Sequence, residues 1–349
     1  MVTNKQLIFS KIPDGLPVNG EHIQVKETTL DLDAALPDGD FILKTLYIAV
    51  DSYLRGRMRD PKKPSWNQAF EINKPMTGDT VSVVVKSNHP NYKVDDIVVG
   101  RSTWGLLESY VQVSADYAKE AYVVRNDAKS NGLPLSTYVG ALGMPGFTAW
   151  YGLTAIGKPK RGEILYVSSA ASPVGQMVGQ LGKAFGLRVV GSAGSEEKVQ
   201  YLKSVGFDAV FNYKEGAILD NLKTHCPDGI DIYFESVGGE MLDAVLSVAN
   251  NFARIIACGM SSQYSLSTPT PLYNTMYIVT KRIKFDGFLV VEHLDLEDAF
   301  LKQVTPWMVN GTIKYKENVF DGIERFNEAL VEVLQGHSLG KVVVHVADL

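Results

Sequence analysis

The sequence contains few of the residues that build disulfides or metal sites. Only two cysteines, Cys226 and Cys258, stand among its 349 residues. Two are too few for a disulfide framework in a chain of this size and for a four-cysteine zinc lobe. These absences predict a reducing compartment and no bound metal. The histidines are scattered, without a pair at metal-ligand spacing, and are His22, His89, His225, His293, His337 and His345.

The sequence also lacks a strong charge of one sign and any long apolar run. Its formal net charge is -5, and no dense run of Lys and Arg is present that would attract nucleic acid or an anionic membrane. No stretch approaches the roughly 18 apolar residues of a membrane span. The apolar run at positions 7–9 is too short for a secretory signal. We therefore expect a cytoplasmic protein whose partner is a small molecule.

What the chain does have is an ordinary globular composition, with 45% hydrophobic and 21% charged residues. Its length suggests about two domains. In the first third, β-branched pieces at 41–50, 80–85 and 96–99 alternate with Gly, Pro, Asp and Asn. That pattern is typical of a compact all-β domain.

From about Gly140 the pattern changes to strand, glycine-rich turn, helix and strand. This alternation favours an α/β fold with a parallel sheet covered by helices. Near the C-terminus, a helix at 326–334 and a strand at 342–346 are expected, and the strand returns to the first domain. We expect the domains at 1–138 and 139–312, with a C-terminal segment at 313–349.

The clearest unit of the second domain is a strand at 164–167, a turn at 168–173 and a helix. The helix presents one apolar face, because its large apolar residues recur at helical spacing. A second strand at 187–190 completes a βαβ unit of a doubly wound sheet. The helix face consists of Val174, Val178, Leu181 and Phe185, and further strands are expected at 209–211, 230–234, 255–258 and 283–288.

The turn after the first strand of this unit suits a dinucleotide pyrophosphate. Such a site needs a tight turn at a helix N-terminus, usually with three glycines. Here those positions hold Ala170, Ser172 and Gly175, yet the turn follows a strand and opens a helix with Pro173 near its first position. The alternative is an ordinary strand-to-helix turn that binds nothing.

The end of the second strand indicates which dinucleotide binds. NAD-specific sites carry an acidic residue there, but this chain has only small residues at 191–195, followed by Lys198. A cation beside a small, hydroxyl-lined pocket suits a 2'-phosphate and favours NADPH. The alternative for Lys198 is a solvated residue balanced by Glu196 and Glu197.

Several motifs, in order along nearly the whole chain, go beyond a generic fold. Together they resemble the prostaglandin reductase and plant double-bond reductase branch of the zinc-free medium-chain dehydrogenase/reductases. The resemblance implies a GroES-like β domain plus a Rossmann domain, with the active site between them, and a homodimer. The motifs occupy Ala49 to Met58, Gly143 to Ala149, Gly191 to Val199, Phe211 to Lys214 and Cys258 to Tyr264.

The resemblance also assigns cofactor contacts. Two family positions that carry Asn are Ser236 and Ser338 here, and serine keeps a hydroxyl but lacks the amide. Zinc-dependent relatives have Gly-His-Glu where this chain has Gly78-Asp79-Thr80. The assigned residues are Pro173, Val174, Gly175 and Gln176 at the pyrophosphate; Gly194, Lys198 and Tyr213 at the adenosine end; Cys258, Gly259, Ser261, Tyr264, Phe288, Leu289 and Val290 at the nicotinamide; and Ser236 and Ser338.

Without a metal, hydrogen-bond donors must polarise the substrate carbonyl. Hydride delivery to the β-carbon of an enal or enone builds charge on the carbonyl oxygen, which a phenol donor stabilises. We expect Tyr264 and Tyr53 to be catalytic, and Tyr53, Trp66 and Trp104 to line the substrate pocket. The predicted function is NADPH-dependent reduction of the carbon-carbon double bond. A zinc-free quinone reductase and a non-catalytic NADPH-binding protein remain alternatives.

Overall fold

The computed structural model describes residues 1–264, 266 and 268–349, with side chains left undescribed at 102, 103, 119 and 120. It divides into two compact units, one of residues 1–140 and 317–349 and the other of residues 141–316. The unit boundaries lie two to four residues after the expected ones at 138/139 and 312/313. No helix in the described part of the chain is both long and apolar enough to span a membrane.

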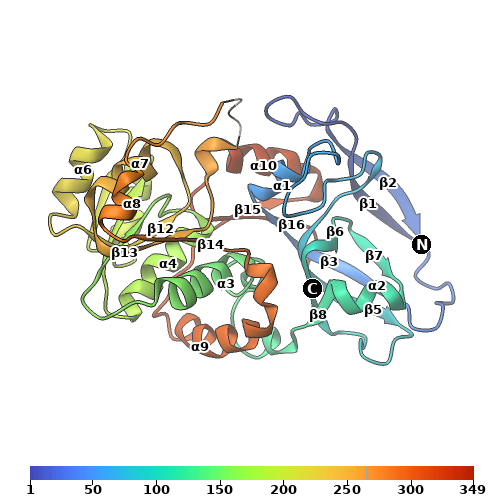
Figure 1. The fold of residues 1–349 in the computed structure, drawn as a ribbon. Helices are drawn as coiled ribbons and strands as arrows, with labels where there is room; N and C mark the ends of the chain where they lie inside the picture. The colour runs from blue at the N-terminus through green and yellow to red at the C-terminus, as the bar shows by residue number, and fades with distance from the viewer. Residues whose placement is uncertain (265, 267) are drawn as a thin grey trace. The chain divides into compact units, whose positions relative to one another are not determined.

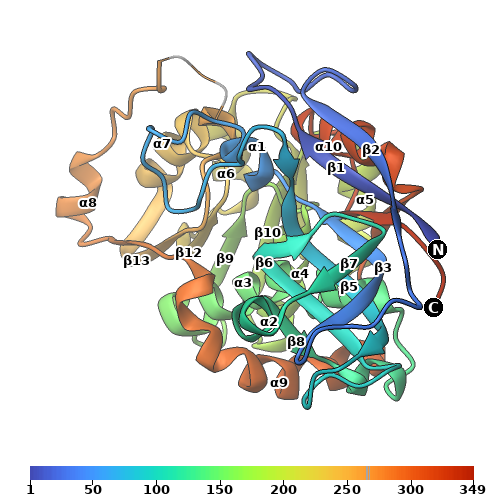
Figure 2. The same cartoon turned by 90° about the vertical axis from the view of Figure 1, so that its right-hand side faces the viewer.

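The first unit is built on two β-sheets (Figure 2). The expected C-terminal strand is present as β16 (Lys341–His345), which pairs antiparallel with β3 (Phe41–Val50) and so belongs to the first unit. A small sheet has the order β2 (Ile23–Leu30), β1 (Val2–Phe9), β4 (Lys74–Pro75). The larger sheet has the order β15 (Glu317–Asp321), β16 (Lys341–His345), β3 (Phe41–Val50), β5 (Thr77–Ser87), β6 (Ile97–Leu106), β8 (Tyr122–Val124), with β7 (Tyr110–Val113) also on β3.

Short helices connect these strands. The apolar core includes Phe9, Leu54, Met76 and Phe326, all nearly inaccessible to solvent. The helix expected at 326–334 is α10. The helical elements are α1 (Tyr53–Arg57), α2 (Ala115–Ala121), η1 (Asn126–Lys129), η2 (Leu135–Val139), η6 (Ile323–Arg325) and α10 (Phe326–Leu334).

The second unit contains one parallel six-stranded sheet (Figure 1). From β9 the chain first builds β10 and β11 to one side, and then β12, β13 and β14 to the other. The point between β9 and β12 is therefore a topological switch point, where α/β sheets bind nucleotides. In order across the sheet, the strands are β11 (Ala209–Asn212), β10 (Arg188–Ala193), β9 (Ile164–Val167), β12 (Ile230–Glu235), β13 (Ala249–Ala257) and β14 (Lys284–Gly287).

Helices cover both faces of this sheet, as expected for strands that are apolar on both sides. Tyr166 and Tyr233 pack with the apolar residues of α6 and α7. Leu165 and Phe234 point the other way, toward α4 and the start of η3. The helical elements are α3 (Met144–Tyr151), the π-helix η3 (Gly152–Gly157), α4 (Pro173–Ala184), α5 (Glu196–Ser204), α6 (Ile218–His225), α7 (Gly239–Val248), η4 (Ser261–Gln263), α8 (Met276–Thr280), η5 (Val290–Leu296) and α9 (Glu297–Val309).

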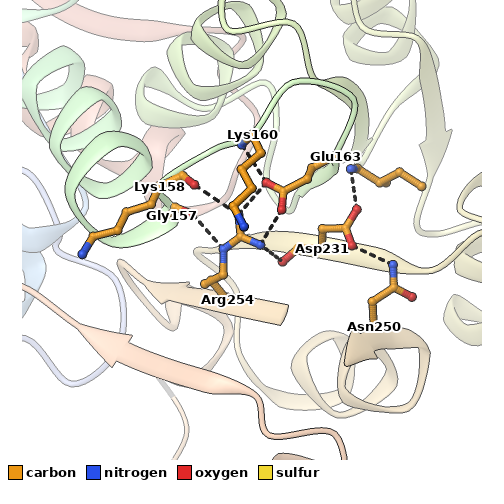
Figure 3. A network of polar contacts seen from close by, with 8 residues as sticks. Gly157, Lys158, Lys160, Glu163, Asp231, Asn250 and Arg254 are labelled. Carbon is orange, nitrogen blue, oxygen red and sulfur yellow. Dashed lines mark hydrogen bonds and ion pairs between the residues drawn. The ribbon is translucent and has the colours of Figure 1, made fainter. Parts of the chain in front are cut away.

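Ion pairing fixes the amino-terminal side of the sheet (Figure 3). The Arg254 guanidinium on β13 donates to both carboxylate oxygens of Glu163, at 2.9 and 2.6 Å. Asp231 on β12 accepts hydrogen bonds from the Ile164 backbone N–H and the Asn250 side-chain amide, each at 2.8 Å. The network joins β9, β12 and β13 at the edge away from the phosphate turn.

Candidate functional site

The phosphate turn has the geometry of a tight strand-to-helix connection. Ser169 adopts a left-handed conformation, with φ of 50°, and Ser172 caps α4 by accepting a hydrogen bond from the Gly175 N–H at 3.0 Å. A Cβ on Gly175 would lie 2.5 Å from the Ser169 carbonyl oxygen and 2.8 Å from the Ala170 Cα. Glycine is therefore required at 175, whereas the fold tolerates Ala170 and Ser172 at the other two motif positions.

Gln176, predicted at the pyrophosphate, is fully buried and has a structural role for its side chain. Its Oε1 accepts hydrogen bonds from the Tyr201 hydroxyl and from the Lys316 N–H at 2.9 Å. Its Nε2 donates to the Lys316 carbonyl at 3.2 Å. The amide side chain thus holds Lys316, the last residue of the second unit, against α4. The Gln176 N–H donates to the Ser172 carbonyl at 3.1 Å, within the first turn of the helix.

The predicted adenosine-end residues come together at the ends of β10 and β11. The two strands are parallel neighbours, with Ala193 opposite Asn212, and the Tyr213 N–H donates to the Ala193 carbonyl at 3.1 Å. Ser195 caps α5 by accepting from the Lys198 N–H at 3.4 Å. A Cβ on Gly194 would lie 3.1 Å from the Tyr213 ring, so glycine allows this close approach.

The predicted nicotinamide residues lie in the loops that follow β13 and β14, and Ser236 lies in the loop that follows β12. The Ser236 N–H donates to the Ser168 Oγ at 3.1 Å, which ties the loop to the turn after β9. The Ser261 N–H donates to the Ser236 carbonyl at 3.0 Å. The Phe288–Val290 segment follows the neighbouring strand β14 and packs its first ring 5.5 Å from Tyr151.

Two ionisable groups, Glu235 and Cys258, lie where β12 and β13 pass into these loops. Glu235 is fully buried, and burial raises the pKa of its carboxyl, while the Val237 and Gly238 N–H groups donate to its Oε1. Burial, with a smaller effect of Glu235, raises the pKa of the Cys258 thiol to about 12. Cys258 therefore stays protonated at neutral pH and is a poor nucleophile toward electrophilic substrates.

Tyr264 ends the short turn η4 beside these groups. Its hydroxyl oxygen accepts a hydrogen bond from the Met260 N–H at 3.3 Å, which leaves its own proton available for donation. The side chain is 57% exposed. A Cβ on Gly259 would lie 2.9 Å from the hydroxyl, so glycine makes room for the phenol.

In the first unit, Tyr53 begins α1 and lies beside Trp66, with ring centroids 6.0 Å apart. The Tyr53 hydroxyl points at the Asp79 carboxylate at 3.4 Å. Burial, followed by the charges of Asp79 and Asp51, raises the phenol pKa well above 10. In the sequence, Asp79 is notable only because zinc-dependent relatives carry a histidine at this position. The structure adds that its carboxylate accepts a hydrogen bond from the Tyr53 hydroxyl.

The other predicted residues of the first unit lie elsewhere. Trp104 packs 6.0 Å from Tyr117, at the edge of the cluster around Phe41 and Tyr122, whereas Tyr53 packs on the cluster around Leu54 and Phe70. Ser338 lies in the turn between α10 and β16. The structure therefore groups Tyr53 with Trp66 and leaves both Trp104 and Ser338 outside that pair.

A buried ion pair that the sequence did not predict lies close to Tyr53 in the chain. The Lys341 ammonium on β16 is fully buried and lies 2.7 Å from the Asp51 carboxylate, two residues before Tyr53. It also donates to the Val50 carbonyl at 3.1 Å. The partners are 290 positions apart, so no local pattern pointed to them. Within the described residues, no cluster of three or more His, Cys, Asp or Glu is arranged to hold a metal.

Comparisons with known proteins cover both units. Residues 5–118 match the model for the N-terminal domain of oxidoreductase, and residues 173–305 match the model for zinc-binding dehydrogenase. A zinc-type alcohol dehydrogenase-like protein of Schizosaccharomyces pombe is 43% identical, over 100% of both chains.

A relative with a stated activity and a solved structure are also similar over nearly their full lengths. The NADP-dependent 2-alkenal reductase of Nicotiana tabacum is 41% identical, over 99% of this chain and 98% of that protein. The crystal structure of CurA from Vibrio vulnificus in complex with NADPH superposes with a TM-score of 0.87 at 33% identity, covering 99% of this chain and 100% of that one.

Proposed function

The chain belongs to the zinc-free, double-bond-reductase branch of the medium-chain dehydrogenase/reductases, and from this premise we propose that it uses NADPH to reduce the carbon-carbon double bond of α,β-unsaturated aldehydes and ketones. The observation that carries the proposal is the 41% identity to the 2-alkenal reductase along almost all of both chains. The residues of the second unit fit the cofactor, because the Gly175 turn has no room for a Cβ and Lys198 follows a strand end without an acidic residue.

NADPH, when bound, supplies the hydride. The chain's residues have the tasks of holding the cofactor and of stabilising the charge that develops on the substrate. Attack at the β-carbon moves electron density to the carbonyl oxygen, and a preorganised donor there lowers the barrier. The Tyr264 phenol suits this role because its oxygen already accepts from the Met260 N–H while its proton remains free to donate. A neutral phenol can donate without ionising.

The experiment is product identification after incubation with NADPH and an enal such as 2-hexenal. The expected product is the saturated aldehyde, identified by mass spectrometry and NMR. An allylic alcohol would show that the carbonyl is reduced instead. NADPH oxidation that is faster with a simple quinone would favour a quinone reductase, and no turnover with any acceptor would favour a binding protein.

Assembly as a homodimer is part of the proposal. The strand β14 ends the six-stranded sheet, and its backbone edge has no further strand beside it within the described part of the chain. Large apolar side chains on the segment that precedes β14 in the sequence are exposed, namely Tyr273 at 81%, Met276 at 69% and Val279 at 71%. Exposed apolar patches of this kind mark interaction sites. Light scattering should give twice the 38.3 kDa chain mass.

We place the protein in the cytoplasm, where its two free cysteines would stay reduced.

A further inference from the structure

A lysine of the C-terminal strand is buried against the segment that leads into Tyr53. Lys341 is the first residue of β16, and its side chain is inaccessible to solvent. Its ammonium lies 2.7 Å from the Asp51 Oδ2, which is itself buried, and donates to the Val50 carbonyl at 3.1 Å. The antiparallel register brings these groups together, because it places Val342 opposite Val50. Lys341 therefore holds the point at which β3 passes into α1.

Asp51 in turn sets the start of α1. Its carbonyl accepts a hydrogen bond from the Leu54 N–H at 3.2 Å, which closes the first turn around Tyr53. Leu54 belongs to the same apolar cluster as Val342, so packing holds one side of α1. The ion pair anchors the residue that precedes the helix, since a buried carboxylate is stable only where its cation lies. Lys341 thus restricts where this turn can lie.

The same ion pair sets the charge around the Tyr53 phenol. The Tyr53 hydroxyl donates to the Asp79 carboxylate at 3.4 Å. After burial, the negative charges of Asp79 and Asp51 are the largest effects that raise the pKa of this phenol. Lys341 compensates Asp51 directly, whereas its other acidic neighbour, Glu317 on β15, accepts a hydrogen bond from a serine hydroxyl. Loss of the ammonium would therefore change both the charge near the phenol and the support of its helix.

From this arrangement we infer that Lys341 is a positioning residue for Tyr53. By holding Asp51, it keeps the tyrosine ring where the ring forms a wall of the substrate pocket. The inference rests on the proposed enal reduction and on the proposed contact between Tyr53 and the substrate. A pair that only stabilised the fold would change the free energy of unfolding and leave KM for the enal unchanged.

The test removes both charges together. Lys341→Met alone would leave the buried Asp51 carboxylate without its cation, whereas replacing both members of a buried ion pair by uncharged residues is often neutral for stability. For the double variant Asp51→Asn/Lys341→Met we expect KM for 2-hexenal to rise about fivefold to tenfold, with kcat within about twofold of the wild type. The kcat should persist because the proposed donor to the substrate, Tyr264, belongs to the second unit.

A double-mutant cycle identifies the residue through which the pair acts. In a Tyr53→Ala background, the same two substitutions should leave KM unchanged, because the side chain that they displace is absent. The matched control is Glu108→Gln, which alters another buried carboxyl of the first unit, bonded to Asn4 and Gln6. This control should leave KM unchanged whatever its effect on stability. Urea unfolding of each variant establishes that it is folded under the assay conditions.

The outcomes separate this inference from the function on which it rests. A wild-type KM in the folded double variant would show that the pair is only structural and would overturn the inference. A rise in KM that persists undiminished in the Tyr53→Ala background would also overturn it, because the pair would then act by another route. If Tyr53→Ala itself leaves KM unchanged, the substrate contact of Tyr53 and the inference both fail, while a saturated aldehyde product would leave the proposed reaction standing.

Discussion

Two tyrosines were predicted to assist the reaction, and their hydrogen bonds differ. The Tyr53 hydroxyl points at the Asp79 carboxylate, so its proton is directed to a group of the protein. The Tyr264 hydroxyl oxygen accepts from the Met260 N–H, so its proton remains free. The difference favours Tyr264 as the donor to the substrate and Tyr53, beside Trp66, as a wall of the substrate pocket.

Tyr264→Phe should therefore lower kcat more than Tyr53→Phe does. Loss of one donor to a developing oxyanion costs about 3 kcal/mol, or on the order of a hundredfold. Tyr53→Phe should have a smaller effect, mainly on KM, because it keeps the ring beside Trp66 and removes only the hydroxyl that donates to Asp79. Steady-state kinetics with NADPH and an enal measure both effects. A larger loss of kcat in Tyr53→Phe would reverse the two roles.

A second prediction concerns the phosphate turn. Gly175→Ala should weaken NADPH binding and destabilise the protein by about 1–3 kcal/mol, because its Cβ would meet the backbone at 169 and 170. Gly56→Ala is the matched control, since a Cβ on this glycine of α1 meets nothing within 4 Å. Denaturant unfolding and fluorescence titration measure the two effects. Normal NADPH binding by Gly175→Ala would mean that the pyrophosphate lies elsewhere.

At the scale of elements, α4 does more than present its N-terminus to the cofactor. Gln180, one turn after Gln176, accepts from the Lys314 N–H at 2.8 Å and donates to the Lys314 carbonyl at 2.7 Å. The second unit ends at Lys316. Two buried glutamines on α4, Gln176 and Gln180, thus bind the backbone of Lys316 and Lys314, two residues apart in this last segment. The amide groups replace the partner strand that this backbone would otherwise require.

Gln180→Met should destabilise the protein by about 1–3 kcal/mol, because the two hydrogen bonds between the buried Gln180 amide and the Lys314 backbone would be lost. Gln200→Met provides the comparison, since Gln200 on α5 is exposed and donates to the Glu196 carboxylate on the helix surface. That change should stay within about 0.5 kcal/mol. Urea unfolding of the two variants tests the prediction, and equal stabilities would show that the glutamine contacts contribute nothing net.

The ion pair between Glu163 and Arg254 predicts how stability depends on pH. Burial is the largest single effect and raises the pKa of the Glu163 carboxyl, but the hydrogen bonds from Arg254 and the Lys160 N–H, together with the charges of Arg254 and Lys160, outweigh it and lower the pKa below 4.5. A lowered pKa in the folded state means that the stabilisation is present above the unfolded pKa and is lost as pH falls through the folded value.

Glu163→Gln should therefore cost about 2 kcal/mol at pH 7. The difference from the wild type should shrink as the pH drops below about 4.5. Unfolding midpoints in urea at pH 7 and at acid pH measure this change. A difference that stays constant with pH would mean that the carboxyl does not titrate differently in the folded and unfolded chain.

At the scale of the whole molecule, the sheet order of the second unit explains how one cofactor site uses so many separate segments. Parallel strands end at one edge, and the chain changes direction across the sheet between β9 and β12. We therefore expect the loops after β10 and β11 to hold the adenosine end of the cofactor, and those after β12, β13 and β14 to hold the nicotinamide end.

Activity should be independent of metal. The described residues hold no cluster of metal ligands, and Asp79 stands where zinc-dependent relatives carry histidine. Dialysis against a strong chelator should leave the rate of enal reduction unchanged. A loss of activity that zinc restores would contradict this prediction.

The sequence alone determined elements of both units. The expected strand at 164–167 is β9, and the helix at 326–334 is α10, without any shift in bounds. Both are defined locally, the strand by a four-residue apolar run and the helix by apolar residues on one face. The glycine at 175 and the missing acidic residue at 191–195 are also features of short sequence segments. Both could therefore be identified from the sequence alone.

Only the tertiary structure decided what the individual polar side chains do. Lys341 meets Asp51, and Tyr53 meets Asp79, because segments that are separate in the sequence fold together. Gln176 appeared in the sequence as a phosphate-turn residue, but its side chain is committed to Lys316, 140 positions away. Backbone propensity and periodicity act over a few residues, whereas the partner of a buried polar group is set by packing, and local sequence contains no signal for it.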